Sequence, residues 1–254
     1  MKRRNLVNRR QRTEPSERCI YGIHPVTEWL AACPAQVRVV YCDAAAADHT
    51  AAVRARAAAA GIPVQLCPAE TLTTLGNSSR HQGVVAACRP FPYVALDTVL
   101  AKTPRLIVLA DQLQDPHNLG ALLRTAQAVG AGAVIIPKDG SVSVTATVEA
   151  VAAGAAARLP VCRVTNLRRS LAELKEAGYW TVGLTPRGGR DLFEFDPPER
   201  VVMVLGGETG IRPLVSKQCD FLISIPMTGS IESLNASVAA AVALYELWRR
   251  WRVA

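Results

Sequence analysis

Polar residues whose side chains could take part in chemistry follow three apolar runs in the sequence from residue 105 onwards. Asn118 and Arg124 follow the first run, Glu208 follows the second, and Ser233 and Asn235 follow the third. Each residue also has a purely structural explanation. An asparagine or serine can cap a helix, and a helical arginine can cover apolar surface with its aliphatic part. Taken one loop at a time, the residue types leave both interpretations open.

Several kinds of active site are excluded by the motifs. The segment LGGETGIRP has two glycines directly after an apolar run, which would let another group approach the backbone, but no Gly-Lys-Ser/Thr follows, so it is not a P-loop. The sequence has no Gly-x-Ser-x-Gly elbow and no Ser/His/Asp order. Its seven cysteines include no Cys-x-x-Cys pair, so we expect buried, reduced thiols and no zinc site.

The apolar segments from residue 105 onwards predict alternating strands and helices. Continuous runs such as RLIVLAD and VVMVLG are typical of buried parallel strands. Helices are expected over 118–129, 145–157, 166–177 and 212–218 and from about 233, with Asn118 and Ser233 as N-caps and Asn235 in the first turn of the last helix. This alternation predicts an α/β fold with a parallel sheet covered on both faces. Ligands bind outside the carboxyl ends of such strands, where the three loops lie.

Residues 18–90 show a second, shorter alternation of helix and strand patterns. The alanine-rich stretch Ala44–Ala60 is expected to be helical, and runs such as VRVVYC and QGVVAAC are expected to be strands. This pattern predicts a small α/β domain over 18–90. The proline-rich segment 91–104 has no long periodic stretch and is expected to be a linker. No apolar run approaches the roughly 18 residues of a membrane span, so we expect a cytoplasmic protein.

The charge of the chain is concentrated at its start. Residues 1–18 hold seven Lys/Arg and two Glu, a charge of +5, out of a net +8 for the whole chain. Residues 1–17 are polar without periodicity and are expected to be a disordered basic tail. Such a tail could attract a polyanion or could simply aid solubility.

The three loops together resemble a known family more specifically than any of them alone. In order, DPHNLGALLRTA, LGGETGIRP and ISIPMTGSIESLNASVAAAVALYE resemble the three motifs of the SpoU family of RNA ribose methyltransferases. YGIHPV and RHQGVVA resemble the L30e-like RNA-binding domain of bacterial 23S rRNA guanosine-2′-O-methyltransferases. The resemblance implies a methyltransferase domain over 105–254 with a C-terminal trefoil knot of the SPOUT type, and a homodimer with active sites at its interface.

The resemblance also implies which residues form the site. It assigns catalytic roles to Asn118, Arg124, Glu208, Ser233 and Asn235. It assigns binding of S-adenosylmethionine, with no metal, to Leu205, Gly206, Gly207, Ile225, Met227 and Leu234. One departure is visible, because the family's second motif often reads G-x-E-G-x-G whereas Thr209 follows Glu208 here. Which glycine contacts the cofactor therefore stays open.

The implied activity is methyl transfer from S-adenosylmethionine to the ribose 2′-hydroxyl of a guanosine in large-subunit (23S) ribosomal RNA. The family proposal makes Arg124 the base, but arginine is essentially never neutral, so Arg124 could instead bind RNA phosphate. His24, His81 and His117 are candidates for RNA contact, although lone histidines are more often structural. The alternatives are the same chemistry on transfer RNA or another rRNA nucleotide, and a non-catalytic RNA-binding ribosome-assembly protein.

Overall fold

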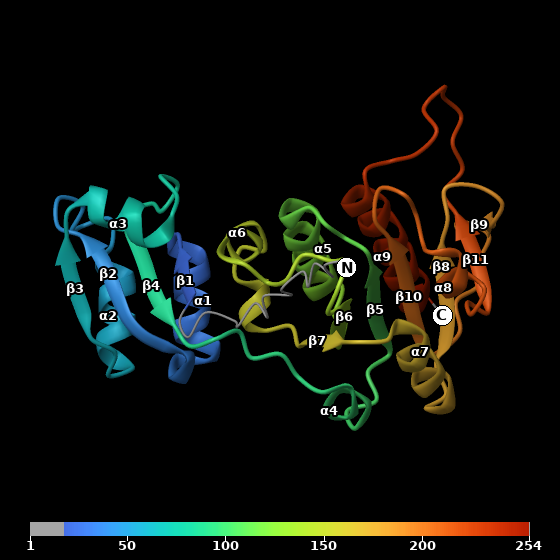
Figure 1. The fold of residues 1–254 in the computed structure, drawn as a ribbon, viewed down its shortest axis with the longest axis horizontal. Coiled ribbons are helices and arrows are strands. Elements are labelled where there is room, and N and C mark those ends of the chain that lie inside the picture. The colour runs from blue at the N-terminus through green and yellow to red at the C-terminus, as the bar shows by residue number, and fades with distance from the viewer. Residues whose placement is uncertain (1–17, 254) are drawn as a thin grey trace, which may run out of the picture.

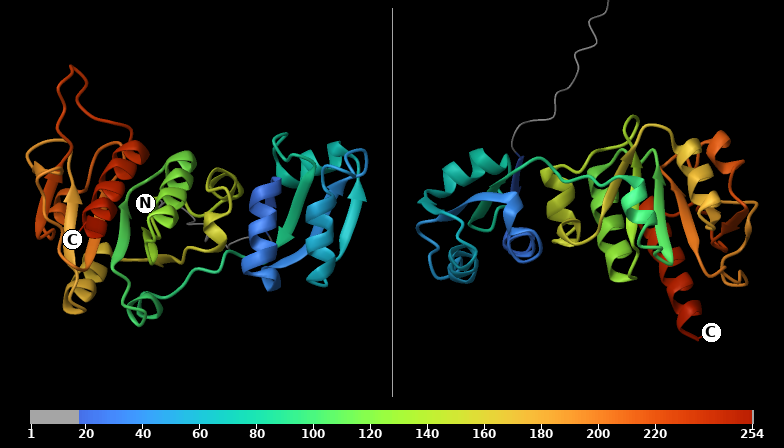
Figure 2. Two further views of the ribbon diagram at one scale, coloured as in Figure 1. Left: turned by 180° about the vertical axis from the view of Figure 1, so that it is seen from behind. Right: turned by 90° about the horizontal axis from the view of Figure 1, so that it is seen from below.

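The computed structural model describes residues 18–253, which form two separate β-sheets with their helices (Figures 1 and 2). The predicted basic tail, residues 1–17, lies outside the described residues. No helix in the described part of the chain is long and apolar enough to cross a membrane.

The first sheet has four strands in the order β1-β4-β2-β3 and is formed by the small α/β unit predicted for this part of the chain. Strands β2 and β3 are parallel, and the other pairs are antiparallel. Its core gathers around the fully buried indole ring of Trp29. The elements are β1 (Arg18–Tyr21), α1 (Ile23–Ala32), η1 (Pro34–Gln36), β2 (Val37–Asp43), α2 (Ala51–Ala59), β3 (Val64–Cys67), α3 (Ala69–Gly76) and β4 (Val84–Cys88).

The predicted alanine-rich helix is wrong in its first half, because α2 begins only at Ala51. Side-chain hydrogen bonds hold residues 44–50 in turns instead. The Asp43 carboxylate accepts from the backbone N–H of Ala45 at 3.0 Å, and the Thr50 hydroxyl donates to the carbonyl of Ala46 at 3.2 Å. Such local bonds compete with helix formation, which high alanine propensity alone does not overcome.

The second sheet has seven strands in the order β7-β6-β5-β10-β8-β11-β9, and all its pairs are parallel. The prediction of a parallel sheet is therefore confirmed. The strands are β5 (Leu106–Asp111), β6 (Ala133–Pro137), β7 (Val161–Val164), β8 (Trp180–Leu184), β9 (Arg190–Asp191), β10 (Val201–Gly206) and β11 (Phe221–Ser224). The helices are α4 (Leu96–Leu100), α5 (Pro116–Ala128), α6 (Ala146–Val151), η2 (Ala155–Ala157), α7 (Leu167–Glu176), α8 (Pro213–Ser216) and α9 (Ala236–Val253).

Helices cover both faces of this sheet, as the continuous apolar strands predict. Alternate residues of β5 enter different cores: Val108 packs on the side of α5, α6 and α9, and Ile107 packs on the side of α4, α7 and α8. The segment predicted as a linker contains α4, because Leu96 and Val99 are buried against the second of these faces. A helix of five residues is too short to give a periodic signal.

Two predicted features of the helices are wrong in detail. Asp115, and not Asn118, caps α5: its Oδ1 accepts from the N–H of His117 at 2.9 Å, with Pro116 at the first helical position. The helix predicted over 145–157 ends at Val151, because Ala153 and Gly154 have left-handed φ angles of 49° and 91°. This break turns η2 towards α1 of the small unit.

The junction between the two sheets is a close contact that includes buried charges. At Gly154, a Cβ atom would lie 2.3 Å from Cγ of Glu28, so only glycine fits there. Arg158 forms an ion pair with the same Glu28. Glu149 on α6 is 1 % exposed and its carboxylate lies 3.5 Å from the guanidinium of Arg18 on β1. Burial raises the pKa of Glu149 to about 7, although the charge of Arg18 opposes the shift.

The seven cysteines are all free thiols in the structure. Burial raises the pKa of Cys88 and Cys219 to about 12 and that of Cys162 to about 11. These thiols are therefore protonated at neutral pH and behave as packing side chains.

The buried Glu149 predicts a pH dependence of stability. Its pKa is higher in the folded protein than in the unfolded chain, so the folded state binds the proton more tightly between pH 4.5 and about 7. The stability contributed by protonated Glu149 is therefore present below pH 4.5 and lost as the pH rises through about 7. Relative to Glu149→Gln, the wild type should lose about 3 kcal/mol across this window, at ~1.4 kcal/mol per pKa unit.

Urea unfolding of both proteins between pH 4.5 and 8 measures this difference. Glu173→Gln is the control, because Glu173 pairs with Arg169 on the surface of the same helix, α7, away from the junction. A stability difference between wild type and Glu149→Gln that stays constant over this pH range would contradict the prediction.

Candidate functional site

The strand order brings the ends of four strands to one edge of the large sheet. Strand β10 lies between β5 and β8, and its register places Gly206 level with Asp111. Because all pairs are parallel, the loops after β5, β8, β10 and β11 leave the sheet at the same edge. The chain runs outwards from β5 through β6 to β7 and then crosses to β8, and such a switch in direction is where open α/β sheets bind ligands.

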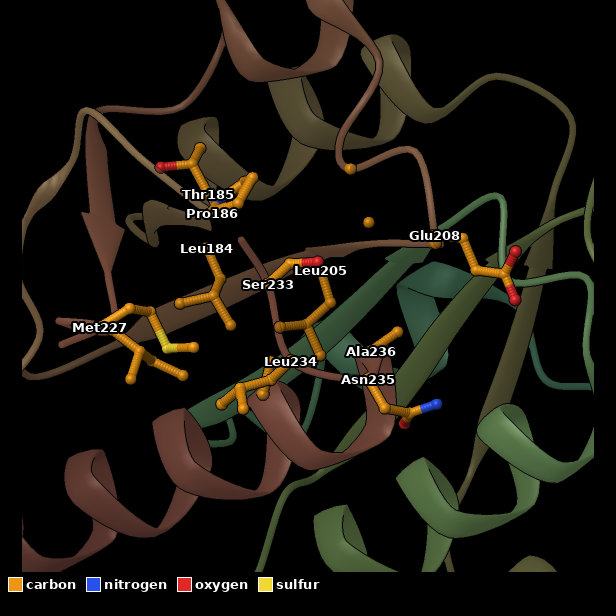
Figure 3. A pocket seen from close by; sticks show the side chains of 15 residues that line it. Leu184, Thr185, Pro186, Leu205, Glu208, Met227, Ser233, Leu234, Asn235 and Ala236 are labelled. Atoms are coloured by element: carbon orange, nitrogen blue, oxygen red, sulfur yellow. The ribbon is translucent and has the colours of Figure 1, made fainter. Parts of the chain in front are cut away.

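A cavity of about 310 Å³ lies at this edge, within the range of small-molecule sites (Figure 3). It is formed by the ends of β8, β10 and β11 and by the beginning of α9. It contains all six predicted cofactor-binding residues and three of the five predicted catalytic residues. These nine are Leu205, Gly206, Gly207, Glu208, Ile225, Met227, Ser233, Leu234 and Asn235.

The two glycines after β10 are needed for close backbone contacts within the protein itself. A Cβ atom at Gly206 would lie 2.1 Å from the carbonyl carbon of Gly210, and one at Gly207 would lie 2.4 Å from the carbonyl oxygen of Gln112. The loop folds back on itself, with the N–H of Gly210 donating to the carbonyl of Gly207 at 3.0 Å. The loop therefore forms a tight, backbone-lined wall of the cavity.

An ion pair between a buried carboxylate and a partly exposed arginine ties this loop to the end of β5. Asp111 is completely buried, and its carboxylate accepts from the backbone N–H and from Nε of Arg212, both at 2.9 Å. Nη2 of Arg212 lies 2.8 Å from the same carboxylate. The N–H of Gly207 also donates to the carbonyl of Asp111 at 3.0 Å. Sequence reasoning missed this pair, although a single acidic residue at the end of an otherwise apolar strand was a signal.

The beginning of α9 differs from the prediction. Asn235, and not Ser233, occupies the capping position: its Oδ1 accepts from the N–H and the hydroxyl of Ser237 at 2.9 and 2.7 Å, and the helix begins at Ala236. An asparagine accepts these bonds as well as a serine does, so the sequence alone did not decide between the two residues. Both residues nevertheless line the cavity.

Sequence reasoning also missed the contribution of β8. Leu184, Thr185 and Pro186 line the cavity at the end of this strand. The N–H of Thr185 donates to the carbonyl of Ile223 at 2.9 Å, which holds the ends of β8 and β11 together. The strand itself was predicted, but its place beside β10 depends on the strand order.

The cavity has an apolar and a polar side. In Figure 3, Leu184 and Met227 lie towards one side of the view, and Glu208 and Asn235 lie towards the other. Among residues 18–253, no group of three or more His, Cys, Asp or Glu side chains could hold a metal ion. The chemistry available here is therefore binding by backbone groups and apolar side chains, with an amide and a carboxylate at one side.

Asn118 and Arg124, the other two predicted catalytic residues, lie on α5 and do not line the cavity. Asn118 is 5 % exposed in the first turn of α5, and Arg124 is exposed six residues later. Within the described residues, the guanidinium of Arg124 forms no hydrogen bond or ion pair, so Glu208 does not hold it in the single chain. Helix α5 packs against α9, which begins at the cavity.

Comparison with known proteins gives matches over nearly all of the described chain. Residues 105–245 match the model of the SpoU rRNA methylase family, and residues 19–94 match that of the RNA 2′-O ribose methyltransferase substrate-binding domain. The 23S rRNA (guanosine-2′-O-)-methyltransferase RlmB of Neisseria meningitidis is 42 % identical, covering 94 % of this chain and 97 % of that protein. RlmB of Coxiella burnetii is also 42 % identical, over 91 % and 95 %.

Solved structures agree with these matches. The SpoU methyltransferase AviRb of Streptomyces viridochromogenes, in complex with the cofactor AdoMet, superposes with a TM-score of 0.82 at 27 % identity, covering 98 % of this chain and 96 % of that one. The TrmH/SpoU tRNA-modifying enzyme of A. aeolicus has a TM-score of 0.53 at 28 % identity and covers 62 % of this chain and 83 % of that one. With its parallel sheet and the cavity that gathers the second and third motifs, the chain belongs to the SpoU rRNA methylase family.

Proposed function

We propose that the protein transfers a methyl group from S-adenosylmethionine to the ribose 2′-hydroxyl of a guanosine in large-subunit (23S) ribosomal RNA. The main support is the convergence of residues from two distant motifs on one cavity at the carboxyl edge of the sheet. Relatives that carry this activity in their names are 42 % identical over more than nine-tenths of the chain. Within this proposal, residues 18–90 bind the RNA, residues 91–104 connect the two parts, and residues 105–254 carry out methyl transfer.

The cavity suits the cofactor in size and in the chemistry of its walls. Leu184, Leu205, Leu234 and Met227 offer apolar surface to an adenine ring, and the backbone of the loops after β10 and β11 offers hydrogen bonds to its edge. When bound, S-adenosylmethionine supplies an activated methyl group on a sulfonium centre. The protein therefore needs to bind, align and stabilise charge, and it needs neither a covalent nucleophile nor a metal.

Arg124 is proposed to act as a permanently charged group. A guanidinium stays protonated at neutral pH and does not accept the hydroxyl proton. It can instead bind the RNA phosphate and stabilise negative charge that develops on the ribose oxygen. Asn118 would orient the arginine or the ribose, and Ser233 and Asn235 would line the transfer region together with Glu208.

The same proposal includes a homodimer. In one chain Arg124 lies on α5, outside the cavity, and a second copy could present its own Arg124 to the cavity of the first. This arrangement, the C-terminal trefoil knot and a cytoplasmic location come from the resemblance to the family and are part of the proposal.

Transfer RNA is the second candidate substrate, because the tRNA-modifying enzyme of A. aeolicus shares the fold. That enzyme matches only 62 % of this chain, whereas the relatives named for 23S rRNA match over 91–94 %. A non-catalytic RNA-binding role is disfavoured, because Asn118, Arg124, Glu208 and Asn235 are all present.

Transfer of labelled methyl from S-adenosylmethionine to unmodified large-subunit rRNA, followed by mapping of the modified nucleotide, tests the function. A single labelled guanosine ribose is the expected result. Label on transfer RNA alone would keep the chemistry and overturn the substrate. If the protein binds S-adenosylmethionine but methylates neither free RNA, ribosome-assembly intermediates are the next substrates to assay. If it does not bind S-adenosylmethionine, the non-catalytic role is favoured.

Arg124→Ala should abolish methyl transfer and leave cofactor binding nearly unchanged. The side chain does not line the cavity and, within the described residues, forms no hydrogen bond or ion pair with the residues that do, so its removal should not alter the affinity for S-adenosylmethionine. Calorimetric titration with the cofactor and the methyl-transfer assay separate the two effects. Normal turnover by Arg124→Ala would show that the assignment is wrong.

Asp111→Asn should weaken cofactor binding about tenfold, which corresponds to ~1.4 kcal/mol. The neutral amide no longer balances the charge of Arg212 and keeps only one accepting oxygen, so part of the bonding that fixes the path of the loop after β10 is lost. Asp196→Asn is the matched control, because Asp196 is 98 % exposed in its pair with Arg250. Equal cofactor affinity for the two variants would contradict the role given to the pair of Asp111 with Arg212.

A further inference from the structure

A second cavity, of about 550 Å³, lies where the small unit meets the large sheet. One side is formed by the turn between β1 and α1 and by the loop between α3 and β4. The other side is formed by the beginning of α5 and by α6. Figure 1 shows the loop before β4 and the long loop after β11 at the same, upper edge of the molecule.

The cavity is lined by residues of two sequence motifs, YGIHP and RHQG, that have no role in the proposed methyl transfer. The Gln82 Oε1 atom accepts from the N–H of Ile23 at 3.1 Å, and the N–H of Gly22 donates to the carbonyl of Val84 at 3.1 Å. These bonds hold the two motifs side by side, with His24 and Arg80 at the cavity.

His81 has a structural role. It is 8 % exposed, its Nδ1 accepts from the N–H of Gly83 at 3.0 Å, and its Nε2 bonds the hydroxyl of Thr73 at 3.2 Å. Both ring nitrogens are therefore occupied. His81 fixes the loop that presents Arg80 and Gln82 to the cavity.

The remaining donors suit an anion. The side chains of His24, Arg80 and His117 are exposed, and within residues 18–253 none of them forms a hydrogen bond or an ion pair. Among the described residues no acidic side chain lines the cavity, and the one lining residue of the Phe/Tyr/Trp type, Tyr21, is 9 % exposed, so little ring surface is open for base stacking. Cationic and N–H donors without an accessible stacking surface match a phosphodiester better than a nucleobase.

Helix α5 connects this cavity with the residues of methyl transfer. His117 and Arg124 are seven residues apart, which places them on the same face of the helix about 10 Å from each other, at ~1.5 Å per residue. Both side chains are exposed. An RNA strand bound at His117 can therefore follow the surface of α5 towards Arg124.

We propose that this second cavity binds a phosphodiester of the substrate RNA close to the methylated nucleotide, through Arg80, His24 and His117. The inference rests on the proposed RNA substrate and adds the place where its backbone is held between the two parts of the chain. The cavity thereby sets the distance between the bound backbone and the cofactor cavity.

The test compares Arg80→Ala with Arg56→Ala in binding to an unmodified large-subunit rRNA transcript over 50–200 mM salt. Arg56 on α2 is also exposed and does not line the cavity, so both variants lose the same charge. Arg80→Ala should weaken RNA binding about tenfold and reduce the slope of log K against log salt by about 0.7–0.9, the loss of one phosphate contact. His117→Ala should also weaken binding several-fold, because the phosphate loses one N–H donor.

Equal RNA affinity and an equal slope of log K against log salt for Arg80→Ala and Arg56→Ala would overturn the inference. Affinity for S-adenosylmethionine, measured on the same samples, should stay at the wild-type value and shows that the variants are folded. A wild-type protein that fails to methylate rRNA, but whose RNA binding still depends on Arg80 in this way, would refute the proposed function and leave the phosphate site standing.

Discussion

The parallel pairing of β10 with β5 on one side and β8 on the other is the constraint on which the site depends. It brings the ends of strands that are distant in the sequence to one level, and the buried carboxylate of Asp111 then fixes the next segment through Arg212. A completely buried charge must be paired, and removal of one partner of such a pair typically costs several kcal/mol. The path of the loop at Gly206 and Gly207 follows from this pair, and so does the shape of the cavity wall.

The residues proposed to bind the cofactor line the cavity, whereas the charged arginine proposed to act on RNA lies outside it. Its walls are mostly backbone and apolar side chains, which suit a cofactor that brings its own activation. The arginine proposed to act on RNA stays outside, exposed on α5, where a permanently charged group retains its hydration in the absence of RNA. The chain thus has one preformed cavity for a small molecule and, apart from it, the exposed arginine that we propose to contact RNA.

The junction links the two parts of the chain through α6 and η2. Glu149 on α6 is buried beside Arg18 of the small unit, and α6 also packs against α5, where a Cβ atom at Gly120 would lie 2.6 Å from Val151. The small unit is therefore in contact, through one short helix, with the helix that carries Arg124. RNA held between the two units would be positioned relative to that helix by packing.

The sequence by itself determined the α/β class and the parallel character of the large sheet, and its resemblance to the SpoU family supplied most of the cavity residues. Continuous apolar strands separated by amphipathic helices leave few other folds, and loops after parallel strands must share one edge. The ends of individual helices were less certain. Asn235 and Ser233 are both good N-caps for the last helix. The alanine-rich stretch from Ala44 has helical propensity, but side-chain hydrogen bonds hold its first residues in turns.

Only the tertiary structure decided which strands are neighbours. The place of β8 beside β10 brings Thr185 into the cavity, and the pairing of Asp111 with Arg212 joins residues 101 positions apart. Such long-range contacts depend on the packing of whole elements and have no periodic signature in the sequence. For the same reason the sequence did not predict the junction cavity at Arg80 and His117, which is formed by residues from both units.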